Sequence, residues 1–247
     1  MTHEIPLTSD FSLTISRFRQ ETEKMKEEAK SYSAQEYLAL ANEQALIANS
    51  EGNYGVGAIY VYRVNGTEYV IGGRNGILSR KNTVLHAEQD TINAVESLAR
   101  GEDTYKDRVL KIRQAPHEME EKKLFTSLEP CIMCTGRILT HKPDEVFIGT
   151  ADDFAGAMLD GREKGLPLLW QGMRNGDFHA PDEKPSPLKV TVATTIPGSE
   201  SYIPEKYLNL GLNIFLSTRE EIDSKMGKNG LSPNLSTIPE NITRLTR

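Results

Sequence analysis

Two short motifs, His86-Ala87-Glu88 and Pro130-Cys131-Ile132-Met133-Cys134, place the strongest constraint on what this chain can fold into. Together they offer one imidazole and two thiolates, a donor set that suits zinc and leaves its fourth tetrahedral position open. A zinc ion with an open position acidifies water toward neutral pH. Glu88 follows the histidine too closely to join the same metal easily, so it is placed to carry protons. The fold must therefore bring both motifs to one point.

Other interpretations of the cysteine pair are weaker. A Cys-x-x-Cys pair is also typical of redox sites and of half a structural zinc site. The chain has 2 cysteines in 247 residues, so no second pair exists to complete a structural site. A redox motif would not require the upstream His-x-Glu. These residues favour a catalytic zinc held by His86, Cys131 and Cys134, with Glu88 as the catalytic proton carrier.

Both motifs are expected at helix N-termini. Apolar residues follow His86 at helical spacing, at Ile92, Val95, Leu98 and Ala99. A second helix is expected after Pro130, with Cys131 and Cys134 one turn apart on one face. The N–H groups and the positive dipole end at a helix N-terminus favour thiolates, which are the metal-binding form of cysteine.

The order of the expected elements predicts an α/β fold. Ser33 caps a helix, Asn65-Gly66 marks a hairpin, and further strands are expected at 123–127, 146–150 and 189–193. Helices between strands indicate a three-layer arrangement, in which a mixed five-stranded sheet is flanked by helices.

The remaining segments are assigned from composition and pattern. Residues 101–121 are interpreted as a charged stretch outside the sheet, and residues 202–218 as a helix. The predicted organisation is an N-terminal helical extension at 1–32, a main domain at 33–217 and a C-terminal tail at 218–247.

Charge and hydropathy narrow the choice of partners. The formal net charge is −6 and the isoelectric point is near 5.5, whereas nucleic-acid affinity depends largely on Lys and Arg. No apolar run approaches the ~20 residues that span a bilayer. No secretory signal is visible, and reduced cysteines fit a reducing compartment. We expect a cytoplasmic homodimer that has a small-molecule substrate and binds neither membrane nor nucleic acid, although a local basic patch could be concealed in the average.

The combined pattern resembles the zinc-dependent cytidine and deoxycytidylate deaminase superfamily. Ser127-Leu128-Glu129-Pro130-Cys131-Ile132-Met133-Cys134 is most similar to the branch that holds guanine, cytosine and tRNA adenosine deaminases. The resemblance extends over residues 35–160. It implies a cytidine-deaminase-like fold, a Zn²⁺ cofactor and hydrolytic removal of an exocyclic amine.

The resemblance also implies substrate contacts. Asn75, eleven residues before the metal-binding histidine, matches an asparagine that hydrogen-bonds base or ribose, although a turn residue is the alternative. Asp152 matches a ribose-side acid, or else caps a helix. Phe154 matches an aromatic residue that stacks on the base, or else lies in the core. Ala87 is also expected to contact substrate. Asp160 is a candidate second acid, with a surface residue as the alternative.

The predicted function is therefore a zinc-dependent aminohydrolase that acts on C–N bonds of cyclic amidines. Its substrate would be a free nucleobase or a nucleoside-like heterocycle, as in nucleobase metabolism. Val84-Leu85 before the histidine resembles cytosine deaminases more than tRNA deaminases. The alternatives are a tRNA adenosine-to-inosine deaminase and a non-catalytic zinc module of a deaminase complex. The presence of Glu88 argues against the second alternative, because a structural zinc has no use for that carboxylate.

Overall fold

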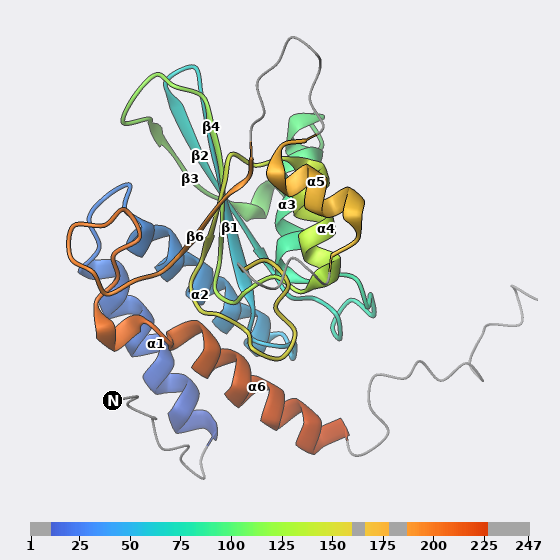
Figure 1. The fold of residues 1–247 in the computed structure, drawn as a ribbon. Helices are drawn as coiled ribbons and strands as arrows, with labels where there is room; N and C mark the ends of the chain where they lie inside the picture. Colours follow the sequence, from blue (N-terminus) through green and yellow to red (C-terminus); the bar gives the residue numbers. More distant parts are fainter. Residues whose placement is uncertain (1–10, 160–165, 178–186, 227–247) are drawn as a thin grey trace, which may run out of the picture.

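The computed structural model describes residues 11–159, 166–177 and 187–226, which form a layered α/β fold (Figure 1). The elements in chain order are α1 (Phe11–Glu27), α2 (Ala34–Ser50), β1 (Gly57–Val64), β2 (Thr67–Arg74), α3 (Ala87–Ala99), β3 (Val109–Gln114), β4 (Glu121–Thr126), α4 (Ile132–His141), β5 (Glu145–Ile148), α5 (Leu168–Asn175), β6 (Lys189–Val192) and α6 (Leu210–Met226). Short 3-10 helices cover Asp103–Arg108 and Glu205–Tyr207.

One mixed sheet forms the middle layer, with its strands in the order β3-β2-β1-β4-β5-β6. β1 pairs antiparallel with β2 and β4, and β2 pairs antiparallel with β3. β4, β5 and β6 run parallel to one another. The parallel pairing of β4 and β5 follows from the helical crossover through α4. The α/β class predicted from the sequence, with a mixed sheet flanked by helices, is confirmed.

Alternate side chains of the sheet belong to two separate cores. Ile59 and Val61 of β1 lie in the core with α1, α2 and α6. Ala58 and Tyr60 of the same strand pack with Ile92 of α3 and with α4. Successive strand side chains point to opposite faces, so β1 contributes to both cores. Figure 1 shows α1, α2 and α6 on one side of the sheet and α3, α4 and α5 on the other.

Local sequence signals explain the turn between β1 and β2 and the start of α2. Asn65 and Gly66 have φ of 50° and 72°, as a two-residue hairpin turn requires, and they join β1 to β2. Ser33 caps α2 through its hydroxyl, which accepts a hydrogen bond of 3.2 Å from the Glu36 amide. Both features were predicted from the sequence.

The sheet has six strands, so the predicted number of five is wrong. The additional strand is β3, which lies inside the stretch 101–121 predicted to be outside the sheet. It pairs only with β2, at the edge, and alternates charged with apolar residues. Charged residues are typical of edge strands, and here they concealed the strand. In the structure these charges attach the strand to its neighbours. Arg113, for example, donates hydrogen bonds to Glu68 of β2 at 2.7 Å and to Glu36 of α2 at 2.9 Å.

The terminal helices pack against the main body. Phe18 and Met25 of α1 are each 1% exposed, and α1 contacts both α2 and α6. The helix predicted at 202–218 is α6, which begins at Leu210 and continues to Met226, across the predicted boundary at 217. The division into 1–32, 33–217 and 218–247 stays a prediction, and residues 1–10 and 227–247 lie outside the described residues. None of the helices in the described ranges is long and apolar enough to cross a bilayer.

Candidate active site

Two helix N-termini meet on one side of the sheet and carry the three predicted metal ligands, His86, Cys131 and Cys134, which we call the metal-binding group. His86 occupies the N-cap position of α3 with an extended backbone, φ −73° and ψ 166°. Cys131 is the N-cap of α4 in the same conformation, φ −68° and ψ 171°, and Cys134 lies in the first turn of α4. Extended caps point their side chains past the end of the helix, where the free N–H groups also lie.

The donor atoms fit a single zinc ion. The ligand atoms of His86, Cys131 and Cys134 all lie within 4.8 Å of one another, and His86 Nδ1 is 3.7 Å from Cys131 Sγ. Tetrahedral zinc with ordinary bond lengths places a nitrogen and a sulfur ligand about 3.6 Å apart. Within the part of the chain that the structure describes, no fourth His, Cys, Asp or Glu joins this group. Three protein ligands and one open position are typical of a catalytic zinc site.

The charges of the three residues and of Glu88 are coupled. The Cys134 thiol, together with His86, lowers the pKa of Cys131 to about 4. The same hydrogen bond, with burial, raises the pKa of Cys134 well above its ordinary value. Burial lowers the pKa of His86, but the Cys131 sulfur and the Glu88 carboxylate outweigh it, so that pKa is raised. These shifts favour a thiolate at Cys131 beside a thiol at Cys134, and a metal cation bound there would displace the protons of its ligands.

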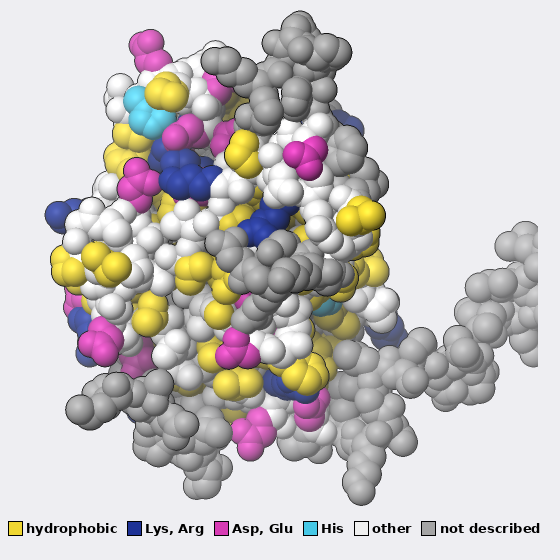
Figure 2. Space-filling view, in the orientation of Figure 1, with side chains coloured by type: hydrophobic (Ala, Val, Ile, Leu, Met, Phe, Trp, Pro, Cys, Tyr) yellow, Lys and Arg dark blue, Asp and Glu magenta, His cyan; other side chains and the backbone are white. Residues whose placement is uncertain are grey.

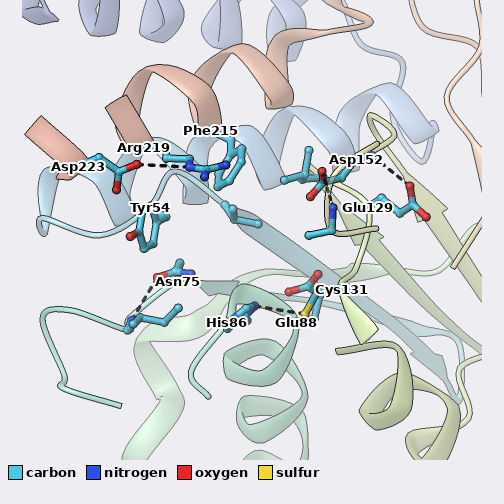
Figure 3. A pocket seen from close by; sticks show the side chains of 14 residues that line it. Tyr54, Asn75, His86, Glu88, Glu129, Cys131, Asp152, Phe215, Arg219 and Asp223 are labelled. Carbon is cyan, nitrogen blue, oxygen red and sulfur yellow. Dashed lines mark hydrogen bonds and ion pairs between the residues drawn. The ribbon is translucent and has the colours of Figure 1, made fainter. Parts of the chain in front are cut away.

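Glu88 has the burial expected of a proton carrier. It is 3% exposed, and burial raises the pKa of its carboxyl group. It lies in the first turn of α3, where the helix dipole favours a carboxylate. The side chain lines a pocket together with His86 and Cys131 (Figure 3). A buried acid at the base of a pocket can exchange protons with a bound molecule while solvent is excluded.

The pocket has a volume of about 340 Å³ and is formed by segments far apart in the sequence. Its described lining residues are Tyr54, Val56, Asn75, Ile77, His86, Glu88, Leu128, Glu129, Cys131, Asp152, Ala155, Phe215, Arg219 and Asp223. In Figure 3 the residues of α6 lie across the pocket from His86, Glu88 and Cys131. The metal-binding group thus stands on one side and α6 on the other.

Two of the predicted substrate contacts line this pocket, and both also stabilise turns. Asn75 is 3% exposed, and its Oδ1 accepts a hydrogen bond of 3.2 Å from the Ile77 amide. Asp152 accepts from the amides of Phe154 and Ala155 at 3.0 and 3.1 Å. Asn75 therefore has the turn role that was weighed as its alternative, whereas Asp152 holds a turn at 153–155 and caps no helix. Both residues also have a place in the pocket wall.

The other predicted contacts lie elsewhere. Phe154 is 84% exposed and absent from the pocket lining, and its ring centroid is 5.4 Å from the guanidinium carbon of Arg219. Ala87 is fully buried in the core between the sheet and α3. Asp160 lies outside the described residues. A stacking role for Phe154, like the contact of Ala87 with substrate, stays a prediction.

Sequence reasoning missed five polar or aromatic residues of the described pocket wall. Glu129 precedes the cysteine motif directly, and a carboxylate at that point was a visible signal. Tyr54 comes just before β1. Phe215, Arg219 and Asp223 recur at intervals of four along α6, the spacing of one helix face. That spacing could have shown that they act together, but nothing in it indicates which part of the fold they face.

The zinc-binding region of this chain matches known deaminases. Residues 31–150 match the family model of the cytidine and deoxycytidylate deaminase zinc-binding region. The tRNA-specific adenosine deaminase of Rickettsia typhi is 26% identical over 118 residues, which cover 48% of this chain and 69% of the relative. The cytosine deaminase of Candida albicans is 30% identical over 121 residues, or 48% of this chain and 67% of the relative. The chain belongs to the cytidine and deoxycytidylate deaminase family.

Solved structures are similar at lower identity. A guanine deaminase from Nitrosomonas europaea has a TM-score of 0.46 and 12% identity, and the alignment covers 79% of this chain and 92% of that one. A structure from a study of tRNA:A34 deaminases has a TM-score of 0.43 and 23% identity, with coverage of 64% and 96%.

Proposed function

We propose that this member of the cytidine deaminase superfamily is a zinc-dependent hydrolytic deaminase of a free nucleobase or a nucleoside. The observation that carries the proposal is the buried Glu88 carboxyl group, which lines the pocket beside His86 and Cys131. A zinc ion held by His86, Cys131 and Cys134 would supply Lewis acidity, which lowers the pKa of water toward about 7.

The protein residues then handle the protons and the orientation of the substrate. Glu88 takes a proton from the water that attacks the amine-bearing ring carbon, and passes it to the adjacent ring nitrogen. It then takes the proton of the hydroxyl now bound to that carbon and delivers it to the amine, which leaves as ammonia, so that a carbonyl replaces the C–N bond. Asn75 orients the substrate through its side-chain amide, since its backbone is fixed by a hydrogen bond of 3.0 Å to the Val56 carbonyl. Asp152 and α6 limit access from the open side.

A small substrate is favoured over tRNA by the distribution of charge. The chain carries a formal net charge of −6. On the face shown in Figure 2, the described Lys and Arg side chains lie in small, separate groups, some of them beside Asp and Glu. A surface that binds RNA by neutralising phosphates needs a continuous basic stripe. A cytoplasmic location and a homodimeric state belong to the same proposal, and light scattering of the purified protein tests the second.

Deamination of tRNA adenosine is the second candidate, because tRNA-specific adenosine deaminases are among the relatives. The test is ammonia release from free bases, nucleosides and nucleotides by the zinc-loaded protein, beside inosine formation in tRNA. We expect turnover of a small heterocycle that changes little between low and moderate salt. Phosphate-based binding of tRNA would instead weaken steeply with salt. Inosine in tRNA with no activity on any small molecule would overturn the proposal and favour the second candidate.

A further inference from the structure

Helix α6 supplies part of the pocket wall and lies outside the matched zinc-binding region at residues 31–150. Phe215, Arg219 and Asp223 line the pocket from successive turns of this helix. Figure 3 shows them across the pocket from His86, Glu88 and Cys131. A substrate whose amine lies at Glu88 therefore presents its opposite end to α6.

The helix is held firmly in this position. Its Thr218 hydroxyl accepts a hydrogen bond of 2.7 Å from the Gly55 amide, next to Tyr54 of the pocket. Near its start, a Cβ on Gly211 would lie 2.2 Å from the Ser127 carbonyl oxygen, so the helix touches the backbone that follows β4. Ile214 between these points is fully buried. Helix α6 is therefore part of the packed fold, and its backbone keeps a fixed position relative to the metal-binding group.

The chemistry of this wall suits a polar but uncharged group. The rings of Tyr54 and Phe215 lie 6.4 Å apart at 51° and provide two apolar surfaces. Arg219 Nε is 3.5 Å from Asp223 Oδ2, which brings a cationic donor and an anionic acceptor side by side. Their side chains are 42% and 57% exposed, so a ligand can reach both. A hydroxyl group can both donate and accept hydrogen bonds. It could therefore accept from the Arg219 guanidinium and donate to the Asp223 carboxylate.

Size and charge select the substrate class further. A volume of about 340 Å³ is at the lower end for sites that enclose drug-sized ligands, and it exceeds the room that a single pyrimidine ring needs. Besides Glu88, the described pocket lining holds three carboxylates, those of Glu129, Asp152 and Asp223, and one guanidinium, that of Arg219. A phosphate would bring its negative charge toward three acids and one guanidinium that is already paired. A sugar without phosphate meets no such repulsion.

We propose that α6 forms a sugar-binding subsite, in which Arg219 and Asp223 hydrogen-bond the hydroxyls of a nucleoside while its base lies near Glu88. This inference rests on the proposed deaminase function, and it narrows the substrate to a nucleoside without a phosphate. Arg219 and Asp223 are specificity-determining residues here, since they contact the part of the substrate that does not react.

The test compares three matched sets: adenine, adenosine and AMP; cytosine, cytidine and CMP; guanine, guanosine and GMP. Ammonia release by the zinc-loaded wild-type protein should favour the nucleoside of one set by at least about tenfold in kcat/KM over both its base and its monophosphate. This comparison requires no variant, so it does not depend on how a substituted protein folds.

Two near-isosteric variants then locate the subsite. Arg219→Gln and Asp223→Asn should each lower kcat/KM for the nucleoside about tenfold or more, through KM with kcat little changed. Turnover of the free base should fall much less than turnover of the nucleoside in each variant. Glu220→Gln is the matched control, because Glu220 lies exposed on the same helix outside the pocket lining. Calorimetric binding of the nucleoside to zinc-loaded Glu88→Gln protein, with and without Asp223→Asn, should show the same loss without turnover.

The outcomes separate this inference from the proposed function. A base or a monophosphate turned over as well as its nucleoside would overturn the subsite and leave the deaminase proposal intact. An equal loss for base and nucleoside in both α6 variants would also overturn it, because their role would then be structural. No ammonia from any member of the three sets would overturn the proposed function, and the subsite with it.

Discussion

Individual carboxylates of the site have separate tasks, which their partners define. Glu88 and Glu129 both line the pocket, but Glu129 also uses both oxygens to organise the loop after β5. Its Oε2 accepts from the Asp152 amide at 3.1 Å, and its Oε1 accepts from the amides of Met158 and Leu159 at 3.0 Å. Glu129 therefore links the wall that carries Asp152 to the start of the cysteine motif.

Glu129→Gln tests this role, because a side-chain amide keeps one accepting oxygen and replaces the other by a donor. At least one backbone amide then loses its partner in a buried position, which costs about 1–3 kcal/mol in the free energy of unfolding. Denaturant unfolding measures the loss. Glu118→Gln, at an exposed position, is the control. Equal unfolding midpoints for the two variants would show that Glu129 does not hold the loop.

Cys134→Ser tests the metal site at its most buried ligand, since Cys134 is fully buried. A hydroxyl is a poor zinc ligand with nearly the same shape, so bound zinc should fall from about one per chain toward zero. Metal analysis after dialysis gives the ratio, and thermal unfolding should show lower stability because metal binding and folding are coupled. Met133→Leu, at the adjacent position, should keep its zinc. Stoichiometric zinc in folded Cys134→Ser protein would contradict the ligand assignment.

At this scale the sequence was informative where function depends on local spacing. The metal-binding residues and Glu88 were predicted because helix N-termini and an i, i+3 pair are local features. Asn75 and Asp152 lie in the pocket wall, and the substrate contacts that the resemblance implies for them stay predictions. The positions of Phe154 and of the α6 residues could not be predicted from local spacing. They depend on how a loop and a distant helix pack against the rest of the fold.

At the scale of elements, the packing of a helix shows whether it is an added extension or part of the core. Helix α1 precedes the matched family region, yet it contacts α2 and α6, and its Phe18 is 1% exposed. Since α6 forms the pocket wall, α1 supports the site from behind. Its polar and charged sequence predicted an accessory helix. Edge strand β3 was not predicted because its sequence is rich in charged residues. In the structure these charges are paired with acidic side chains of α2 and β2.

Phe18→Ala tests the contribution of α1. Removing a fully buried aromatic ring should lower the free energy of unfolding by about 3–5 kcal/mol, through lost burial and the cavity left behind. Leu13→Ala is the matched control on the same helix, where the side chain is 63% exposed, and should change stability by less than about 0.5 kcal/mol. A Phe18→Ala protein as stable as the control would show that α1 is dispensable for the fold.

At the scale of the whole molecule, one sheet positions both halves of the site. β1 and β4 lie at its centre, α3 and α4 approach from one face with the metal-binding residues, and α6 comes from the other layer to close the pocket. The layered α/β class was predictable from the order of helices and strands. The pocket was not, because it needs the packing of α6, some 130 residues beyond His86, against the start of β1.

The most direct test of the central claim compares wild type with Glu88→Gln at equal zinc content, on the small heterocycle that the wild type deaminates best. The substitution removes the proton carrier and keeps its size, so zinc content and thermal unfolding should match the wild type. The rate of ammonia release should fall by at least about 10²–10⁴-fold. Glu96→Gln, on the same helix, should keep the wild-type rate. A Glu88→Gln protein that releases ammonia at a near-normal rate would contradict the account.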